Sequence, residues 1–532
     1  MKNAFAAAFA QGVTTNGTPL KIIGTGAFRF ILQIISLMIM LGVKPMRITV
    51  CKTLEEKYEA YCDEIDKLDD TTAPGTTWKF LKKHIEFTGR PTDLFKLGKG
   101  RTPVMNCIFP TDDNPRAQVA VKAVPGFFLK GVPLYDDENI TIVREIYLYA
   151  VGIIPYKLLP IKCIHIREDN KGLACPGLMF EKMKCDLEKL YDRVNGKISF
   201  NPAVVRDFVY YDSKGDKLES ILNEASPRNG TNIRNLEVIS GLVLYIIDQL
   251  VEWLIAAKAL GMIHSDIKDK NFIISEDGTI YSIDMGLALL TDDAAEKVTT
   301  MIEEKLKTIT DIPFSMSQAV IPAYDLEDYC APKTLWTLLT RKVGSTPSFR
   351  APEHFDLEEY NTRTNTYQLA VVLLYMIIPC LRFMQFDPNR CTDLPEDYML
   401  EKWLDVCMAQ PGRIRSLLDG LLPDSKYREL KDIILDSLIE DPVCRLSTDV
   451  MTMRLEQAMW KIKVHSPEEF MEIVNDGLFI DASSIRPPTF REHGHQIPPP
   501  PNWAIEEPPK PKPQLGFLSR MVSSVSSMLT GN

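Results

Sequence analysis

One short stretch, residues 264–271, constrains the fold of this chain more than any other part of its sequence. It reads H-x-D-x-K-x-x-N, which puts Asp266, Lys268 and Asn271 on one loop, and Asp284 follows thirteen residues after Asn271. An acid, a cation and an amide in this arrangement can hold metal ions and a nucleotide phosphate while a hydroxyl is aligned with that phosphate. The other groups of such a site have to come from other segments of the chain. These segments should follow one another in a definite order along the sequence.

Segments upstream of this loop offer the other charged groups that a phosphate site needs. Residues 119–122 read V-A-V-K at the end of an alternating run, so Lys122 is expected at the end of a β-strand. Glu145 lies in a segment with apolar residues at helical spacing, and it is the natural ion-pair partner of Lys122. Residues 178–183 read as a further strand that runs into a connecting segment.

Two downstream segments complete the series, T-P-S-F-R-A-P-E at 346–353 and E-D-P-V-C-R at 440–445. With these elements in this order, roughly residues 90–462 resemble the eukaryotic protein kinases, and the D-x-K spelling is that of their serine/threonine form. The resemblance implies an α+β, bilobal protein kinase fold. Residues 93–185 would form a small lobe of five antiparallel strands and one helix, and residues 186–462 a large helical lobe.

The resemblance also implies a role for each matching residue. Asp266 would accept or orient the proton of the substrate hydroxyl, and Lys268 would stabilise the transferred phosphoryl group. ATP and a protein substrate are therefore the expected partners, with Mg²⁺ as the cofactor. The resemblance also implies that Lys122 binds the phosphates and is oriented by Glu145, and that Asn271 and Asp284 bind Mg²⁺. Gly98 and Gly100 would cover the phosphates, and Glu181 and Met183 would contact the adenine. Gly286, Glu353 and Arg445 would have structural roles, with Glu353 paired to Arg445.

Three departures from the family pattern keep a second interpretation open. Pro103 stands where a third glycine is usual, and proline lacks an N–H and fixes φ. Ser265 replaces an arginine that normally meets a phosphate on the activation segment, and Asn365 replaces an aspartate, so its hydrogen bonds would lack charge assistance. The alternative is a pseudokinase that binds nucleotide or acts as a scaffold. A third class, a kinase-fold enzyme acting on a small molecule or lipid, is disfavoured by the A-P-E segment, which builds a platform for protein substrates.

Two segments are longer than the family needs. Residues 193–235 are rich in Asn, Asp, Lys and Ser and read as a surface loop. Residues 284–353 span about seventy positions, roughly twice the usual length. If this longer segment blocks the site, trimming part of residues 294–335 should raise activity, and unchanged or lower activity would argue against autoinhibition.

The two ends of the chain read as extensions. Residues 1–54 contain no acid and include an apolar run at 30–43, which is short for a membrane span but fits a signal h-region. A targeting signal or anchor, a buried helix and a short span all remain open for it. Residues 55–92 read as a helical N-terminal extension. Residues 463–532 combine a Pro-rich linker with an amphipathic helix at 515–529, which would dock on a partner or membrane surface, or pack on its own domain.

Composition narrows the function classes further. The net charge of −10 argues against a general nucleic-acid binder. The chain has 11 cysteines and no C-x-x-C pair, so it offers no disulfide framework and no zinc site. The leader, the divergent glycine loop and the large insertions are similar in architecture to the secreted rhoptry-type kinases of apicomplexan parasites. A cytoplasmic or membrane-associated location is expected, and secretion by a parasite-type pathway is the alternative.

Overall fold

The computed structural model describes the chain from Arg47 to Asp476 in seven stretches, residues 47–60, 85–97, 104–123, 137–195, 232–308, 339–377 and 414–476. Short gaps inside these stretches fall at 90, 111–113, 169–173, 341, 343, 347–348, 355–359, 416–417 and 420–421. Several predicted features lie outside the described residues, namely the apolar run at 30–43, Gly98, Gly100 and Pro103, the helix at 515–529, and parts of the two insertions.

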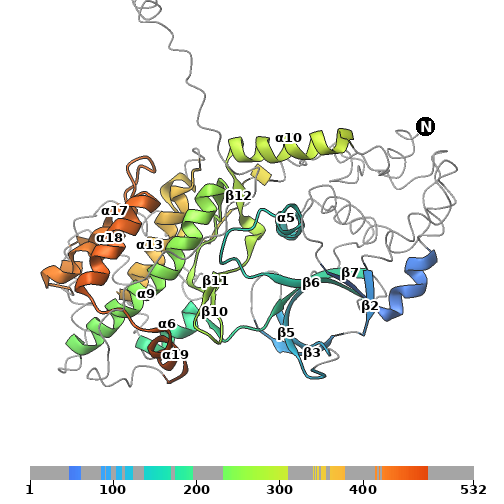
Figure 1. Ribbon diagram of the computed structural model, residues 1–532, viewed down its shortest axis with the longest axis horizontal. Helices are drawn as coiled ribbons and strands as arrows, with labels where there is room; N and C mark the ends of the chain where they lie inside the picture. The colour runs from blue at the N-terminus through green and yellow to red at the C-terminus, as the bar shows by residue number, and fades with distance from the viewer. Residues whose placement is uncertain are drawn as a thin grey trace, which may run out of the picture.

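A seven-stranded mixed sheet forms one side of the molecule (Figure 1), and the chain belongs to the α+β class. The strand order is β2-β1-β6-β7-β5-β4-β3. The strands are β1 (Ile48–Cys51), β2 (Ile85–Thr88), β3 (Thr92–Lys96), β4 (Val104–Ile108), β5 (Gln118–Ala123), β6 (Ile161–Glu168) and β7 (Ala174–Glu181).

Five of these strands form the antiparallel sheet that the sequence predicts, but the sheet is larger and mixed. β3, β4, β5, β7 and β6 pair antiparallel. β1 and β2, from segments expected to be leader and helical extension, add to the β6 edge in parallel. All four residues of β1 are buried. Ile48, Thr49 and Val50 are β-branched and suit a strand, but a run of four residues does not show that it pairs with β6.

Helices make up the other side of the molecule, and one helix covers the sheet (Figure 1). The helix that covers the sheet is α5 (Asp137–Val151). The helical side is built around the long helix α9 (Asn232–Ala259), which packs on α13 and α18. Among the described residues, the other labelled helices are α6 (Leu187–Asn195), α10 (Asp292–Thr308), α13 (Arg363–Ile377), α17 (Arg428–Ser437), α18 (Thr448–Lys461) and α19 (Pro467–Asp476), and residues 55–60 are also helical.

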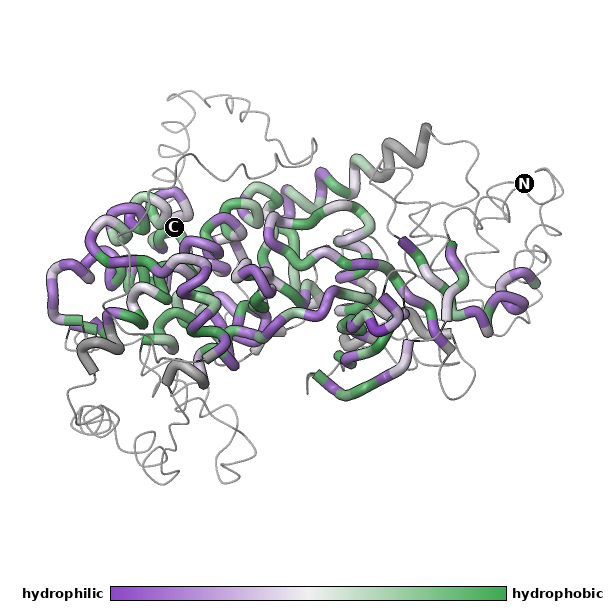
Figure 2. Tube along the Cα trace, turned by 60° about the horizontal axis from the view of Figure 1, so that its bottom comes forward, coloured by the Kyte–Doolittle hydropathy of each residue, from purple (hydrophilic) through white to green (hydrophobic). Residues whose placement is uncertain are grey.

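The apolar character of α9 follows from its position at the centre of the helical side. Within the described part of the chain, residues Glu237–Ala259 form the one helix long and apolar enough to cross a membrane. In this helix, 83% of an 18-residue apolar window is buried inside the protein. A helix that is apolar on all sides is expected in the core of a large domain. Figure 2 shows the same distribution, with apolar residues concentrated where the helices pack together.

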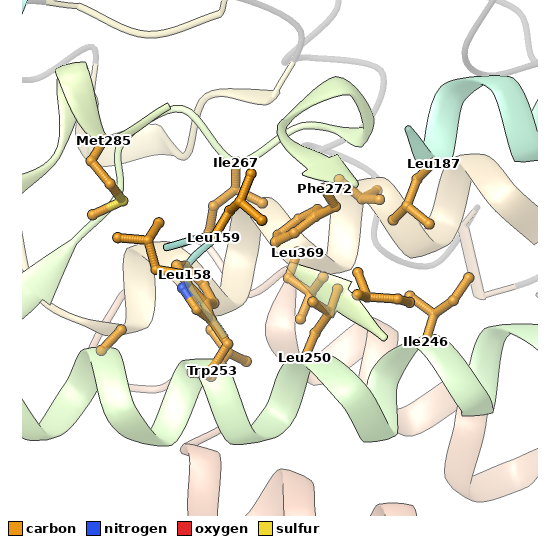
Figure 3. Close-up of a cluster of buried hydrophobic side chains, with 14 of the residues drawn as sticks. Leu158, Leu159, Leu187, Ile246, Leu250, Trp253, Ile267, Phe272, Met285 and Leu369 are labelled. Carbon is orange, nitrogen blue, oxygen red and sulfur yellow. The ribbon is translucent and has the colours of Figure 1, made fainter. Parts of the chain in front are cut away.

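One continuous apolar core joins the two sides of the molecule and supports the loop at 264–271. Trp253 of α9 packs edge-on against Phe272 and His264, with ring centroids 5.9 and 5.8 Å away. Ile267, within the loop, is fully buried and lies over this cluster (Figure 3). Closely packed apolar side chains under the loop therefore keep its charged and polar residues in place.

The packed helical body continues beyond residue 462, where the sequence analysis expects an extension to begin. Phe470 of α19 is fully buried and stacks on Tyr245 of α9, with ring centroids 4.3 Å apart. The Tyr245 hydroxyl donates to the carbonyl of Gly278 at 3.2 Å. Residues 467–476 are thus part of the folded body.

Candidate active site

Two small sheets between the large sheet and the helices carry the loop at 264–271. β9 (Met262–Ile263) pairs with β12 (Leu289–Leu290), and β10 (Phe272–Ile274) lies between β11 (Ile280–Ser282) and β8 (Cys185–Asp186). The loop spans β9 to β10, and Asp284 lies two positions after the end of β11. The Ile283 amide donates to the Asn271 carbonyl at 2.9 Å. Asn271 and Asp284 are therefore brought to the same end of one hairpin.

Lys122, Glu145 and Asp284 form a compact charged cluster, here called the β5 network. Lys122 Nζ lies 2.6 Å from Glu145 Oε2 and 2.6 Å from Asp284 Oδ1. The lysine comes from β5, the glutamate from α5 and the aspartate from the segment after β11. Lys122 and Asp284 are 162 positions apart in sequence, so only the fold unites them.

Lys122 and Asp284 stabilise each other's charge, whereas burial raises the pKa of Glu145 above its usual value. Burial acts to lower the pKa of Lys122, but the carboxylates of Asp284 and Glu145 outweigh burial and hold it above its usual value. Burial acts to raise the pKa of Asp284, but the nearby Lys122 ammonium outweighs burial and lowers this pKa to about 2. At neutral pH the network therefore presents a cation beside an anion, the arrangement that binds phosphate and metal together.

Asp266, Lys268, Asn271 and Thr346 form a second cluster, here called the loop network. Lys268 Nζ lies 2.6 Å from Asp266 Oδ2. The Asn271 amide nitrogen donates to the Asp266 carbonyl at 2.8 Å and to its Oδ2 at 3.0 Å. The Thr346 hydroxyl donates to Asp266 Oδ1 and accepts from Lys268 Nζ at 2.9 Å. A serine or threonine hydroxyl thus fits between the acid and the cation.

Two residues at the site hold backbone angles that L-residues rarely adopt. Ser265 has φ of 61° and Asp284 has φ of 66°. A non-glycine residue in this region carries a cost of about 1–2 kcal/mol, so the surroundings have to hold it there. At Ser265 the Gln368 side chain does so by donating to the Ser265 carbonyl at 3.1 Å.

His264 and Asn365 fix the start of the loop. The Asn365 side chain accepts from the His264 amide at 2.8 Å and donates to the Met262 carbonyl at 2.9 Å. Burial lowers the pKa of His264, so the ring is neutral, and its Nε2 lies 3.0 Å from the Ile283 carbonyl, which assigns the proton to Nε2. The sequence analysis expects weaker anchoring from Asn365 than from aspartate. The structure shows that the amide also makes a second bond, to the Met262 carbonyl, which a carboxylate could not make.

Glu353 and Arg445 form a buried two-pronged ion pair away from the two networks. Both nitrogen–oxygen distances are 2.6 Å, and both side chains are fully buried. The Thr364 hydroxyl donates to the same carboxylate at 2.6 Å, and the Arg445 guanidinium lies 4.8 Å from the centre of the Tyr367 ring. Such a planar, bidentate pair joins η6 (Pro352–His354) to the segment before α18 in a fixed geometry.

Gly286 has a steric reason in the structure. A Cβ atom added there would lie 3.0 Å from Thr141 Cβ and 3.2 Å from the Thr141 carbonyl. Glycine therefore allows the segment after Asp284, which begins η4 (Met285–Leu287), to approach α5 closely. Arg144, a fully buried residue of α5, donates to the Gly286 carbonyl at 3.4 Å.

The predicted adenine contacts occupy the connection between the two sides. Glu181 ends β7 and is exposed, and Met183, just beyond it, is half-buried against the main core. The Lys184 amide donates to the Ile274 carbonyl at 2.9 Å, which ties this connection to β10. Gly98 and Gly100 lie outside the described residues, so no phosphate cover is described.

Some residues that shape the site carry no signal in the sequence. Gln368 anchors the Ser265 carbonyl, and Arg144 bonds the Gly286 carbonyl. An arginine next to Glu145 on an amphipathic helix looks like a surface cation, and a glutamine inside a helix looks neutral. Only the three-dimensional neighbours distinguish them.

The side-chain oxygens of Asn271 and Asp284 suit Mg²⁺, but they are too few to form a complete metal site from protein atoms alone. Within the part of the chain that the structure describes, no group of three or more His, Cys, Asp or Glu side chains could hold a metal ion. Mg²⁺ commonly takes one or two protein oxygens and completes its shell with phosphates and water. Because the Asn271 amide nitrogen is bound to Asp266, the amide oxygen is the atom left to act as a ligand.

Two comparisons with known proteins add no relative. A scan against protein-family models gave no match, and a search of the curated proteins gave none either. The assignment of a function to this site therefore depends on the residues and their geometry.

Proposed function

We propose that this chain is a serine/threonine protein kinase with a bilobal kinase fold, which transfers the γ-phosphate of ATP to a protein hydroxyl. The observation that carries the proposal is the joint assembly of the two networks. Lys122 meets both Glu145 and Asp284, while Asp266 meets Lys268 and Asn271. These residues come from four separate segments of the chain, and the chemistry of phosphoryl transfer gives each one a task.

Phosphoryl transfer needs positioning and neutralised charge more than covalent chemistry. Asp266 would accept or orient the proton of the acceptor hydroxyl, in the position now taken by the Thr346 hydroxyl. Lys268, within 2.6 Å of the same carboxylate, would face the transferred phosphoryl group. Lys122 would bind the phosphates of ATP, and Glu145 would keep the Lys122 ammonium directed toward those phosphates. Glu181 and Met183, at the connection between the two sides, would lie beside the adenine.

The Asn271 and Asp284 oxygens would hold Mg²⁺, which would neutralise phosphate charge when bound. The alternative that the sequence leaves open is a pseudokinase, which would bind nucleotide without transferring phosphate. Both functions use the β5 network, but only the kinase needs Asp266 as a proton acceptor. The two are therefore separated by measuring transfer and binding on the same protein.

The test is transfer of radiolabelled phosphate from ATP, with Mg²⁺, to a generic basic protein and to the chain itself. Wild type is compared with Asp284→Ala, and with Asp293→Ala as a control, because Asp293 is an exposed aspartate of α10. Label that appears in wild type and in the control but not in Asp284→Ala supports the kinase. No label, together with a melting temperature raised by ATP, would favour the pseudokinase.

A further inference from the structure

Lys157 shares an unusual backbone conformation with two residues of the site. Across the described residues, the non-glycine positions with positive φ are Lys157 at 61°, Ser265 and Asp284. Residues in this region carry a conformational cost and tend to gather at functional sites. Ser265 and Asp284 belong to the loop and hairpin of the candidate site. Lys157 lies in the connection between α5 and β6, and the proposed mechanism gives it no role.

The Lys157 side chain is buried in an ion pair with α9. Its Nζ lies 2.8 Å from Glu252 Oε2, and both side chains are at most 5% exposed. Gln249, one turn earlier on α9, accepts a further hydrogen bond from the same ammonium. Burying two charges costs solvation that their attraction often only balances, and an apolar pair of similar size is commonly as stable. What such a pair adds is a fixed direction between the two segments that carry it.

The backbone of Lys157 is joined to the strand that delivers Asp284. The Ser282 amide donates to the Lys157 carbonyl at 2.8 Å, and the Leu159 amide donates to the Ser282 carbonyl at 2.9 Å. Ser282 is the last residue of β11, two positions before Asp284. Leu158, Leu159 and Trp253 of α9 belong to the core cluster drawn in Figure 3, so this connection also packs toward α9.

We infer that Lys157 and Glu252 are positioning residues. Their ion pair holds the end of β11, and with it Asp284, in the place where Asp284 contacts Lys122. This inference rests on the proposed function. The connection at 152–160 leaves α5, which carries Glu145, and Lys157 ties that connection to α9 and to β11 together. A loss of the ion pair would let α5 and β11 shift relative to each other. Small displacements of this kind are costly, since about 1 Å at a reacting group can reduce rates on the order of 100-fold.

The experiment separates positioning from stability with four variants of the full chain. Lys157→Met and Glu252→Met each leave one buried charge and should lower the melting temperature. The double variant Lys157→Met/Glu252→Met replaces both charges by apolar groups and should regain most of that melting temperature. Lys157→Arg keeps the charge. The matched control is Lys258→Met/Asp449→Met, which removes an exposed ion pair of 3.1 Å between α9 and α18.

For the double variant we expect kcat/KM for ATP to be about tenfold or more below wild type, with more Mg²⁺ needed for half-maximal rate. Lys157→Arg should recover most of this loss, and the control pair should change neither quantity. Recovery of both activity and magnesium dependence in the double variant would overturn the inference and leave a pair with a structural role alone.

A second readout keeps the inference separate from the kinase proposal. If wild type transfers no phosphate, the kinase proposal fails, and the same variants are compared by the rise in melting temperature on adding ATP and Mg²⁺. A smaller rise in the double variant than in wild type supports positioning of Asp284. An equal rise in both, or no rise in wild type, overturns it.

Discussion

The β5 network and the loop network have similar chemistry but are built in opposite ways. Three of the four residues of the loop network lie within six consecutive positions, and backbone bonds to Asn365 and Gln368 hold that loop from behind. The β5 network joins side chains from β5, α5 and the segment after β11. Lys122 makes one ionic contact across 23 positions, to Glu145, and one across 162 positions, to Asp284. One network is rigid by local structure and the other depends on how distant elements are packed. Mutations in the two networks should therefore differ in their effects on stability, nucleotide binding and catalysis.

The largest effect is expected from Asp266→Asn, which removes the proton acceptor of the loop network but leaves the β5 network intact. Loss of a general base typically lowers kcat by about 10²–10⁴-fold. The rise in melting temperature on adding ATP and Mg²⁺ should persist, because Lys122 and Asp284 are unchanged. Asp293→Asn is the control. Should the variant lose its response to nucleotide as well, the two networks are not separable.

Lys122→Met tests the other network and should affect both stability and nucleotide binding. It leaves the buried Glu145 carboxylate and the partly exposed Asp284 without their shared cation. Removing one partner of a buried pair costs several kcal/mol, and since Asp284 is partly exposed we expect about 3 kcal/mol in urea unfolding. The thermal response to ATP should vanish. Lys297→Met, at an exposed lysine of α10, should leave both measurements unchanged. A stable variant that still responds to ATP would contradict the assignment of the β5 network.

Buried histidines, rather than Lys122 or Asp284, should contribute to the change of stability with pH near neutrality. With the pKa of Asp284 lowered to about 2 and that of Lys122 raised, neither group titrates near neutral pH. Burial, with a smaller effect of Arg167, lowers the pKa of His165 to about 4 from its usual 6.5. The unfolded chain then binds a proton that the folded chain does not, so stability falls as pH drops from 6.5 to 4.

The contribution of His165 to this loss should be on the order of 2–3 kcal/mol at pH 4. His165→Asn should reduce the slope, because the amide cannot take up the proton but can still meet the Thr49 hydroxyl, which lies 2.8 Å from His165 Nδ1. The measurement is urea unfolding of both proteins at pH 7 and pH 4.5. Equal losses in the two proteins would show that other groups carry the pH dependence.

The smallest effect is expected from Asn365→Asp, which tests how the loop network is anchored. Aspartate would strengthen the bond to the His264 amide but would turn an oxygen toward the Met262 carbonyl, which now accepts from the amide at 2.9 Å. We expect a net loss of about 1–2 kcal/mol, because a buried carbonyl loses its donor. Thermal unfolding checks the sign. A more stable variant would mean that charge assistance outweighs the second bond.

Much of the loop network could be predicted from the sequence, because its parts are close together in the chain. Spacing alone joins Asp266, Lys268 and Asn271 on one loop. The five antiparallel strands could also be expected, because the resemblance of the ordered motifs to protein kinases implies them. The register that brings Lys122 opposite Leu178, and so toward α5, is a property of the assembled sheet.

The parts that could not be predicted depend on neighbours distant in sequence. β1 pairs in parallel with β6, more than 100 positions away, and β2 pairs with β1, so neither partner can be read from these short segments. Lys157 and Glu252 look like two ordinary surface charges until the fold buries them against each other. No local pattern in a single sequence indicates which charged residues will lose their contact with water.

The burial of α9 has a consequence for how the chain is made. Its enclosing partners come late, since α13 begins at Arg363 and α18 at Thr448, while α9 ends at Ala259. At typical synthesis rates the ribosome needs on the order of 10–40 s to add those residues. During this interval a segment as apolar as a membrane span has no finished core to enter. Newly made chains should therefore occupy chaperones for longer than the size of the protein suggests, and overexpression should be limited by the supply of those chaperones.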